Sequence, residues 1–270
     1  MTANFYLPKK PPLKNLVQHV FQTHGLTRFS KEIIFPKGIT EIIFDLGESN
    51  STTVVFGGKE RKVPKCFITS YSIRPSHLEL PTRQTYFGVA IYPGAIGSVF
   101  GIPASEFANQ FVDLTEVDAD IRSLWNQLAE SPAFSSRLAV LSKWILRRMR
   151  PQDGRELMLN TFLSNRQAGN ISVPVLASAL CYSPRHLSRK FMDLTGMNTE
   201  EVLLLKKYTY SLALMHDPGL SLTAIAHQSH FTDQSHFIKA FRSFTDITPG
   251  EYRQKKSQHL PPGHIFHDVR

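Results

Sequence analysis

Six polar side chains of this sequence lie at spacings that suit the recognition of base edges. They are Arg185, Ser188 and Arg189 in one run, and Gln234, Ser235 and Lys239 in another. Residues three or four apart share one face of a helix. Arginine can bond O6 and N7 of guanine together, glutamine can make two bonds to adenine, and serine or lysine can serve a base edge or a phosphate. The chemistry open to these runs is therefore hydrogen bonding in a nucleic-acid groove.

The first run lies in the second helix of a predicted helix-turn-helix unit. The first helix of that unit carries an apolar stripe, formed by Val175, Leu176, Ala179 and Leu180. After a turn at Cys181-Tyr182, Ser183 is a good N-cap, and Pro184 stands at the first helical position, where its missing N–H costs nothing. The helix over 184–194 is expected to bury Leu187, Phe191 and Leu194, and to end at Gly196.

The second run lies in a second unit of the same kind. Its first helix is expected to bury Leu222, Ile225 and Ala226, and Thr232 is expected to cap the helix over 233–244. The apolar stripe of that helix is Phe237, Phe241 and Phe244. The side chains expected on its free face are Asp233, Gln234, Ser235, His236, Lys239 and Arg242. A helix with one face in the core and one face free is the part that enters a groove.

Several short motifs between residues 171 and 253 follow one another in a set order. They are Leu176-Ala177, the run 183–191, Thr195-Gly196, Ile225-Ala226, the run 231–237, Phe241 and the run 248–253. With these motifs the region resembles the DNA-binding domain of AraC/XylS-family transcription regulators. The resemblance implies that helices 184–194 and 233–244 enter adjacent major grooves of double-stranded DNA, and that RNA polymerase is a partner.

The resemblance also implies which side chains contact DNA. The base-edge contacts would come from the six residues of the two runs above. The phosphate contacts would come from seven others, namely Ser183, Thr232, His236, Arg242, Thr248, Arg253 and Lys207. Free backbone N–H groups and a positive dipole at a helix N-terminus favour an anion in any case, which independently supports a phosphate contact near Ser183.

Three positions depart from the pattern of that family. Cys181 and His230 stand at or near turn positions where the family usually has glycine, and Lys207 stands where the connecting helix usually opens with arginine. Glycine adopts left-handed backbone freely, whereas other residues adopt it at some cost. Lysine keeps the charge of arginine but loses its two-pronged geometry. We expect these changes to affect affinity more than fold.

A single helix is predicted between the two units, from Thr199 to Asp217, before Pro218-Gly219. Roughly 17 residues at about 1.5 Å rise give a length of about 25 Å. Successive major grooves on one face of B-DNA lie about 34 Å apart. Our hypothesis is that the DNA bends toward the protein, or that only one unit engages fully.

The first 118 residues predict a small β-sheet domain, rolled into a partial barrel. Short runs rich in β-branched and aromatic residues alternate with turn residues, and the expected strands are 32–35, 41–45, 52–56, 66–71 and 86–91. Two segments, 36–47 and 92–95, resemble the sensor half found in one branch of the same regulator family. That resemblance implies a domain that binds a small-molecule effector or sets dimerisation.

The whole chain is expected to be α+β, with a helical C-terminal part. Two helices over 119–129 and 135–150 either pack on the sheet or form a homodimer contact. Residues 151–154 are the expected joint, and 155–256 the all-α domain of two helix-turn-helix units joined by a linker helix. Residues 257–270 are expected to form a mobile tail.

Composition permits this organisation without demanding it. A chain of 270 residues with 41% hydrophobic content can bury one large core or two ordinary ones, and its net charge of +9 favours a polyanionic partner. Two cysteines cannot make a disulfide framework. No apolar run is long enough for export or for a membrane span. We therefore expect a cytoplasmic protein without a membrane partner.

Two other functions stay open on the residues alone. One is a ligand-binding or enzymatic β-barrel protein with an accessory helical domain, in which Glu41, Asp45 and Glu79 could pair in space. The other is a metal site at His227, His230 and His236, although structural zinc usually takes four ligands, often thiolates. The first 118 residues show no paired-histidine metal spacing, phosphate loop or nucleophile-turn motif. We expect no catalysis, no metal and no cofactor.

Overall fold

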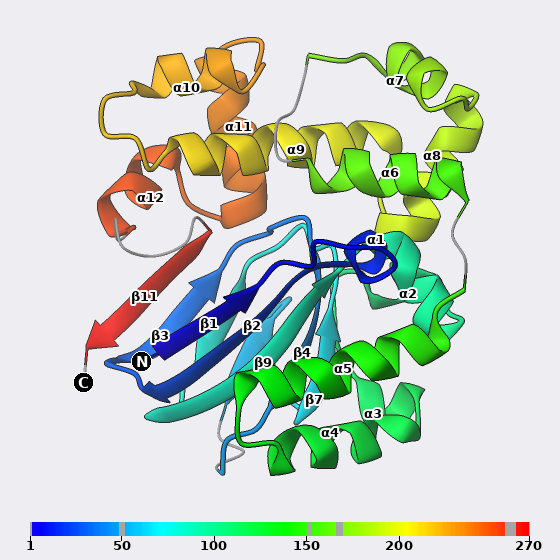
Figure 1. Ribbon diagram of the computed structural model, residues 1–270. Helices are drawn as coiled ribbons and strands as arrows, with labels where there is room; N and C mark the ends of the chain where they lie inside the picture. Colours follow the sequence, from blue (N-terminus) through cyan, green and yellow to red (C-terminus); the bar gives the residue numbers. More distant parts are fainter. Residues whose placement is uncertain (1, 49–51, 151–152, 166–169, 257–262, 270) are drawn as a thin grey trace.

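The computed structural model describes residues 2–48, 52–150, 153–165, 170–256 and 263–269. Two β-sheets and several helices form the N-terminal part, and a cluster of helices lies across one end of the sheets (Figure 1). The predicted α+β class is confirmed. Among the described residues, no helix combines the length and the apolar character that crossing a bilayer requires.

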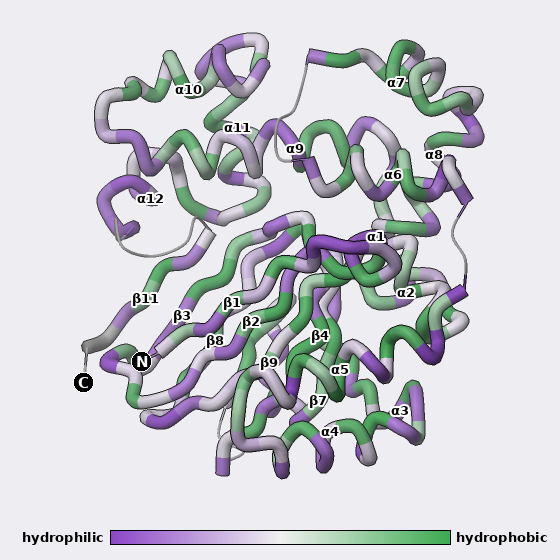
Figure 2. The backbone as a smooth tube through the Cα atoms, in the orientation of Figure 1, coloured by the Kyte–Doolittle hydropathy of each residue, from purple (hydrophilic) through white to green (hydrophobic). Residues whose placement is uncertain are grey.

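The larger sheet has six antiparallel strands in the order β1-β2-β9-β4-β7-β10. Their bounds are Thr2–Tyr6, Val17–Leu26, Arg83–Ile91, Thr40–Asp45, Cys66–Thr69 and Phe111–Asp113, in that order. Strands β4 and β9 are largely buried, and each carries an apolar stretch, Ile42–Phe44 in β4 and Phe87–Ile91 in β9 (Figure 2).

The smaller sheet has five strands in the order β11-β3-β8-β5-β6. Their bounds are His264–Val269, Phe29–Ile34, Ser76–Glu79, Thr53–Phe56 and Lys59–Lys62, in that order. A small apolar core joins the two sheets, since Val54 and Leu78 of one pack with Phe67 of the other. The five predicted strands correspond to β3, β4, β5, β7 and β9. The sequence analysis did not predict the other six strands, β1, β2, β6, β8, β10 and β11.

Helices cover the outer face of the larger sheet. Helices α4 (Asp120–Glu130) and α5 (Phe134–Arg148) bury Ile121, Leu124 and Ile145 in the same core as the strands. The indole N–H of Trp125 donates to the carbonyl of Asp45 over 2.9 Å. This packing on the sheet is one of the two roles expected for these helices, and the dimer contact stays a prediction. Shorter helical segments are α1 (Leu13–Leu16), α2 (Pro93–Phe100), the 3-10 turn η1 (Ala104–Phe107) and α3 (Leu114–Val117).

The C-terminal domain packs around one central helix, α9 (Thr199–Leu214). Its other helices are α6 (Gly154–Ser164), α7 (Val173–Ala179), α8 (Pro184–Thr195), α10 (Leu222–Gln228), α11 (Gln234–Thr245) and α12 (Pro249–Lys255). Tyr208 of α9 is fully buried against the rings of Phe241 and Phe244. The N-terminus of α9 is capped by Asn198, one residue before the expected start, in a reciprocal pair with Glu201.

The end of the chain returns to the N-terminal domain, where residues 264–269 of the expected mobile tail form a strand. Residues 264–269 form β11 and pair antiparallel with β3, with Ile265 opposite Ile33. Ile265 is only 1% exposed and joins the core of the helical domain, while Phe266 packs with the small core between the sheets. Ile265 and Phe266 thus contribute to two different cores, one on each side of β11. Residues 257–262 and 270 lie outside the described part.

Candidate nucleic-acid interface

Helix α8 is built as the sequence predicts. The hydroxyl of Ser183 accepts a hydrogen bond from the backbone N–H of His186, and Pro184 begins the helix. Leu187 and Phe191 are fully buried, and the helix ends at Gly196, whose φ of 72° is left-handed. The stripe predicted for the preceding helix is half wrong, because Leu176 and Leu180 are buried but Val175 and Ala179 are exposed.

Helix α11 begins at Gln234, one residue later than the expected start at Asp233. Asp233, not Thr232, is the N-cap, and its carboxylate accepts from the N–H of His236 over 2.8 Å. Thr232 lies before the cap, with its hydroxyl 3.4 Å from a ring nitrogen of His236. Three positions separate His230 from the cap in this unit, whereas two separate Cys181 from Ser183 in the first. This extra residue moves the cap to the aspartate.

Both turns adopt the left-handed backbone expected at positions where glycine is usual. Cys181 has a φ of 57° and His230 a φ of 61°. The ammonium of Lys207 donates to the carbonyl of His230 over 2.8 Å, which ties the second turn to α9. A backbone that costs energy for a non-glycine residue is thus held by a charged donor.

Four cations on the two helices have exposed side chains. Arg185 and Arg189 lie on α8, and Lys239 and Arg242 on α11. None of them forms a hydrogen bond or a salt bridge with another residue in the part of the chain that the structure describes. Both helices begin on the side away from the sheets, near the two ends of α9, and run toward the N-terminal domain (Figure 1). Exposed cations on two similarly directed helices suit a polyanionic ligand.

The uncharged candidates for base contacts are less free. Gln234 is half-buried, and its side-chain carbonyl accepts from the hydroxyl of Thr223 over 2.8 Å. Ser188 is half-buried and Ser235 is exposed. Nothing in the sequence distinguishes Thr223 as a functional residue, because a hydroxyl near the start of a helix is typical of an ordinary surface position.

The candidates for phosphate contacts fall into two groups. Arg242, His236, Ser183 and Thr232 are exposed. Three others already serve the fold, namely Lys207, Arg253 and Thr248. A guanidinium nitrogen of Arg253 donates to the carbonyl of Leu220 over 2.9 Å, and Thr248 caps α12 in a reciprocal pair with Glu251. Contacts from this second group to DNA stay predictions.

Lys206, next to Lys207, lies inside the domain. Its side chain is nearly buried, and its ammonium donates to the carbonyls of Phe162 and Asn165 at the end of α6. Burial lowers the pKa of Lys206 to about 8.

The histidine and carboxylate clusters weighed from the sequence do not assemble. Across the described residues, no three His, Cys, Asp or Glu side chains come together as metal ligands would. Glu41 and Asp45 lie near opposite ends of β4, and each faces its own lysine, at 2.7 Å and 3.8 Å respectively. Glu79 lies in the other sheet. Burial acts to raise the pKa of Glu41, but Lys37, with smaller contributions from His264 and His19, outweighs burial, and the pKa is lowered.

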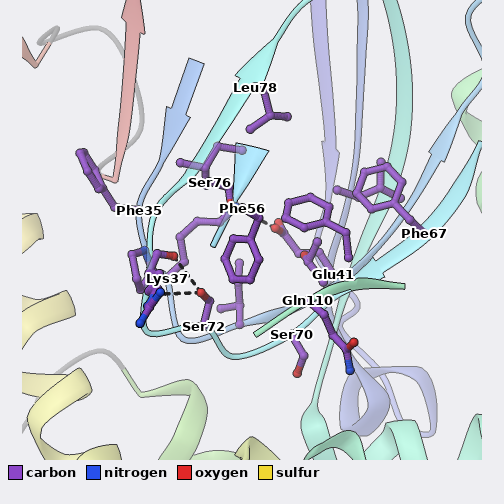
Figure 3. A pocket seen from close by; sticks show the side chains of 17 residues that line it. Phe35, Lys37, Glu41, Phe56, Phe67, Ser70, Ser72, Ser76, Leu78 and Gln110 are labelled. Carbon is purple, nitrogen blue, oxygen red and sulfur yellow. Dashed lines mark hydrogen bonds and ion pairs between the residues drawn. The ribbon is translucent and has the colours of Figure 1, made fainter. Parts of the chain in front are cut away.

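A cavity of about 90 Å³ lies between the two sheets of the N-terminal domain. Phe56, Phe67 and Leu78 supply part of its apolar lining, and Lys37 with Ser72 lies at one end (Figure 3). The loop that carries Lys37 also contacts the helical domain. A Cβ at Gly38, whose φ is +64°, would lie 3.4 Å from the side chain of Leu205 in α9. One loop therefore borders both the cavity and the helix that joins the two units.

Comparisons with known proteins agree with the geometry of the C-terminal part. Residues 176–255 match a family described as a helix-turn-helix domain, and residues 4–113 match a domain of unknown function (DUF6597). The uncharacterized HTH-type transcriptional regulator YijO of Escherichia coli K12 is 26% identical over 102 residues, or 38% of this chain. The HTH-type transcriptional regulator GadX of Escherichia coli O6:H1 is 29% identical over 101 residues, or 37% of this chain. Each match spans 36% of the relative's length.

A solved structure of ToxT from Vibrio cholerae O395 aligns with 86% of this chain and 97% of its own. The sequence identity is 15% and the TM-score is 0.47.

Proposed function

We propose that this chain is a transcription regulator of the AraC type, which binds double-stranded DNA sequence-specifically through the helix-turn-helix domain matched by residues 176–255. The observation that carries the proposal is the pair of helices α8 and α11, which keep the side chains of Arg185, Arg189, Lys239 and Arg242 exposed. Regulators of this kind bind DNA rather than turn over a substrate, and we propose the same of this chain.

The two helices would enter adjacent major grooves. Helix α9 has 16 residues, which at about 1.5 Å rise span about 24 Å. That length falls short of the roughly 34 Å between successive major grooves. The DNA would therefore bend toward the protein, or one helix would engage more fully than the other. A circular-permutation gel shift without a bend, together with a footprint over two grooves, would contradict this geometry.

The direct test is selection of bound fragments from random duplex DNA by the full chain. The expected outcome is a recovered motif with two half-sites about one helical turn apart. Binding that retains no sequence preference at physiological salt would overturn the proposal, because phosphate contacts alone give non-specific affinity.

The N-terminal domain would adjust DNA binding by taking up a small-molecule effector. The cavity supports this, because the loop bearing Lys37 and Gly38 borders it and also packs on Leu205 of α9. An effector that favours one arrangement of this loop would shift the position of α9 by its differential affinity. The cavity is smaller than the roughly 300 Å³ of typical ligand pockets, so it would have to open. RNA polymerase and a second copy of the chain are the further partners we propose.

The effector proposal is tested with Ile43→Trp, which places a large ring in the cavity lining. We expect the variant to bind its selected DNA as the wild type does but to lose any change in affinity on addition of small-molecule fractions. A full response in this variant would show that the effector binds elsewhere.

A further inference from the structure

One hydrogen bond joins the two helices of the second helix-turn-helix unit at its surface. Thr223, the second residue of α10, donates its hydroxyl to the side-chain carbonyl of Gln234, the first residue of α11, over 2.8 Å. Thr223 is exposed and Gln234 is half-buried. The amide is therefore held in place on the face where α11 presents its other polar side chains.

The first unit has no counterpart of this bond. Counted from the N-caps Ser172 and Ser221 of the leading helices, the position of Thr223 is taken by Pro174. Counted from the N-caps of the recognition helices, the position of Gln234 is taken by Pro184. Proline side chains carry no hydrogen-bonding group. Since the first unit forms its turn without such a bond, the bond is not a requirement of the helix-turn-helix geometry.

We propose that Thr223 is a positioning residue that fixes the amide of Gln234 for reading one base edge. This inference rests on the proposed DNA-binding function and deepens it. A glutamine side chain loses rotamer freedom when it binds a ligand, and a side chain already held by a neighbour has less to lose. The hydroxyl of Thr223 therefore makes the contact of Gln234 with DNA both stronger and more selective.

The direction of the bond also says what kind of base edge is read. With one lone pair of the amide oxygen taken by Thr223, the amide nitrogen is the end with all of its hydrogen-bonding capacity left for DNA, namely two N–H donors. Acceptors in the major groove are N7 and O6 of guanine, N7 of adenine and O4 of thymine. The sequence allowed glutamine to make two bonds to adenine. We now expect Gln234 to bind its base mainly by donating an N–H to one of these acceptors.

The experiment measures base discrimination by the full chain with matched variants at position 223. Thr223→Val removes the hydroxyl and keeps the size and β-branching, whereas Thr223→Ser keeps the hydroxyl. The selected duplex and its single-base variants are titrated with each protein, and Gln234→Ala identifies the base pair that the amide reads. Circular-dichroism melting establishes that each variant is folded.

We expect Thr223→Val to reduce discrimination at that base pair about three- to tenfold, the value of one net hydrogen bond. Its affinity for random duplex should equal that of the wild type, and Thr223→Ser should restore discrimination. In the Gln234→Ala background, Thr223→Val should change nothing. Gln234→Glu, which exchanges the donor for an acceptor, should shift the preference toward a cytosine, whose N4 donates.

Two results would overturn the inference while leaving the proposed function intact. One is an equal loss of affinity for selected and random duplex in Thr223→Val. The other is an unchanged base preference in Thr223→Val when Gln234→Ala alone loses it. A wild-type chain that selects no sequence at all would instead overturn the proposed function, and this inference with it.

Discussion

Single residues of the two units differ in how freely they can meet a ligand. Arg185 and Arg189 extend from α8 without a partner in the described structure, whereas Gln234 is held by Thr223. Lys207 and Arg253 carry the same charge as the free arginines but donate to backbone carbonyls. Charge alone therefore does not identify a DNA contact, and the partner that a side chain already has decides what it can still bind.

Substitution of an arginine in α8 and of one in α11 should change DNA binding in different ways. We expect Arg189→Ala to cost about 1–3 kcal/mol of specific binding and to relax the choice at one base pair. Arg242→Ala, the matched loss of one exposed cation, should weaken binding to all sequences alike and reduce the salt slope by about one. Fluorescence anisotropy titrations over a series of salt concentrations measure both. An equal loss on specific and random duplex for Arg189→Ala would reassign it to a phosphate.

The cap of α11 predicts a difference in stability between two neighbouring residues. Asp233→Ala removes the carboxylate that accepts from the N–H of His236, and it should lower the free energy of unfolding by about 1 kcal/mol. Thr232→Ala, at the position first expected to cap the helix, should cost clearly less. Urea denaturation of the full chain compares the two, and a larger effect at Thr232 would return the cap to that residue.

Among the helices, α9 joins the two units and also reaches the N-terminal domain. Its side chains meet α6 through Lys206, the second turn through Lys207 and the loop at Gly38 through Leu205. A displaced loop would therefore press on the one helix that sets the spacing of α8 and α11. The helix is held by the hydrogen bonds of Lys206 and Lys207 to backbone carbonyls as well as by its apolar face.

The buried lysine of α9 predicts a rise of stability with pH. The pKa of Lys206 is about 8 in the folded chain, below its usual value of 10.5. Between these values the unfolded chain binds more protons than the folded chain, so the free energy of unfolding increases as pH rises. The increase should be at most about 3 kcal/mol relative to Lys206→Met, which has no proton to lose. Parallel pH dependences for both proteins between pH 8 and 10.5 would contradict the assignment.

In the whole molecule, the last strand binds the two domains together. Strand β11 pairs with β3, the N–H of Phe35 donates to the carbonyl of Gly263, and the ring of Phe35 packs on Tyr252 of α12. The helical domain is therefore attached to the sheets by a segment that follows it in the sequence. The strand therefore fixes helix α12 next to the sheet that borders the cavity.

Because β11 joins the two domains, a substitution that shortens a buried side chain in this strand should strongly lower the stability of the chain. Ile265→Ala removes a fully buried side chain at the contact between the domains, and it should destabilise the full chain by about 2–4 kcal/mol. His267→Ala, a half-buried position on the same strand, is the control and should cost less than about 1 kcal/mol. Guanidinium unfolding measures both. A negligible effect of Ile265→Ala would mean that β11 contributes little to the contact.

Much of the C-terminal domain could be read from the sequence, because its signals act over a few residues. The cap at Ser183, the left-handed turns at Cys181 and His230, and the stripe of Phe237 and Phe241 are local features of backbone and side chain. The cap of α11 was missed because one extra residue in the turn moved it, and hydroxyl and carboxylate caps look alike in sequence.

The sequence by itself determined that two helix-turn-helix units joined by a helix would form, with most helix ends within a few residues, since propensity, capping and apolar period depend on neighbours along the chain. Only the tertiary structure decided which polar side chains are free. The partners of Lys206, Gln234 and Ile265 lie on other elements, and β11 finds its partner strand more than two hundred residues earlier. Packing between distant elements sets those contacts, because burial and hydrogen bonding depend on what lies adjacent in space rather than in sequence.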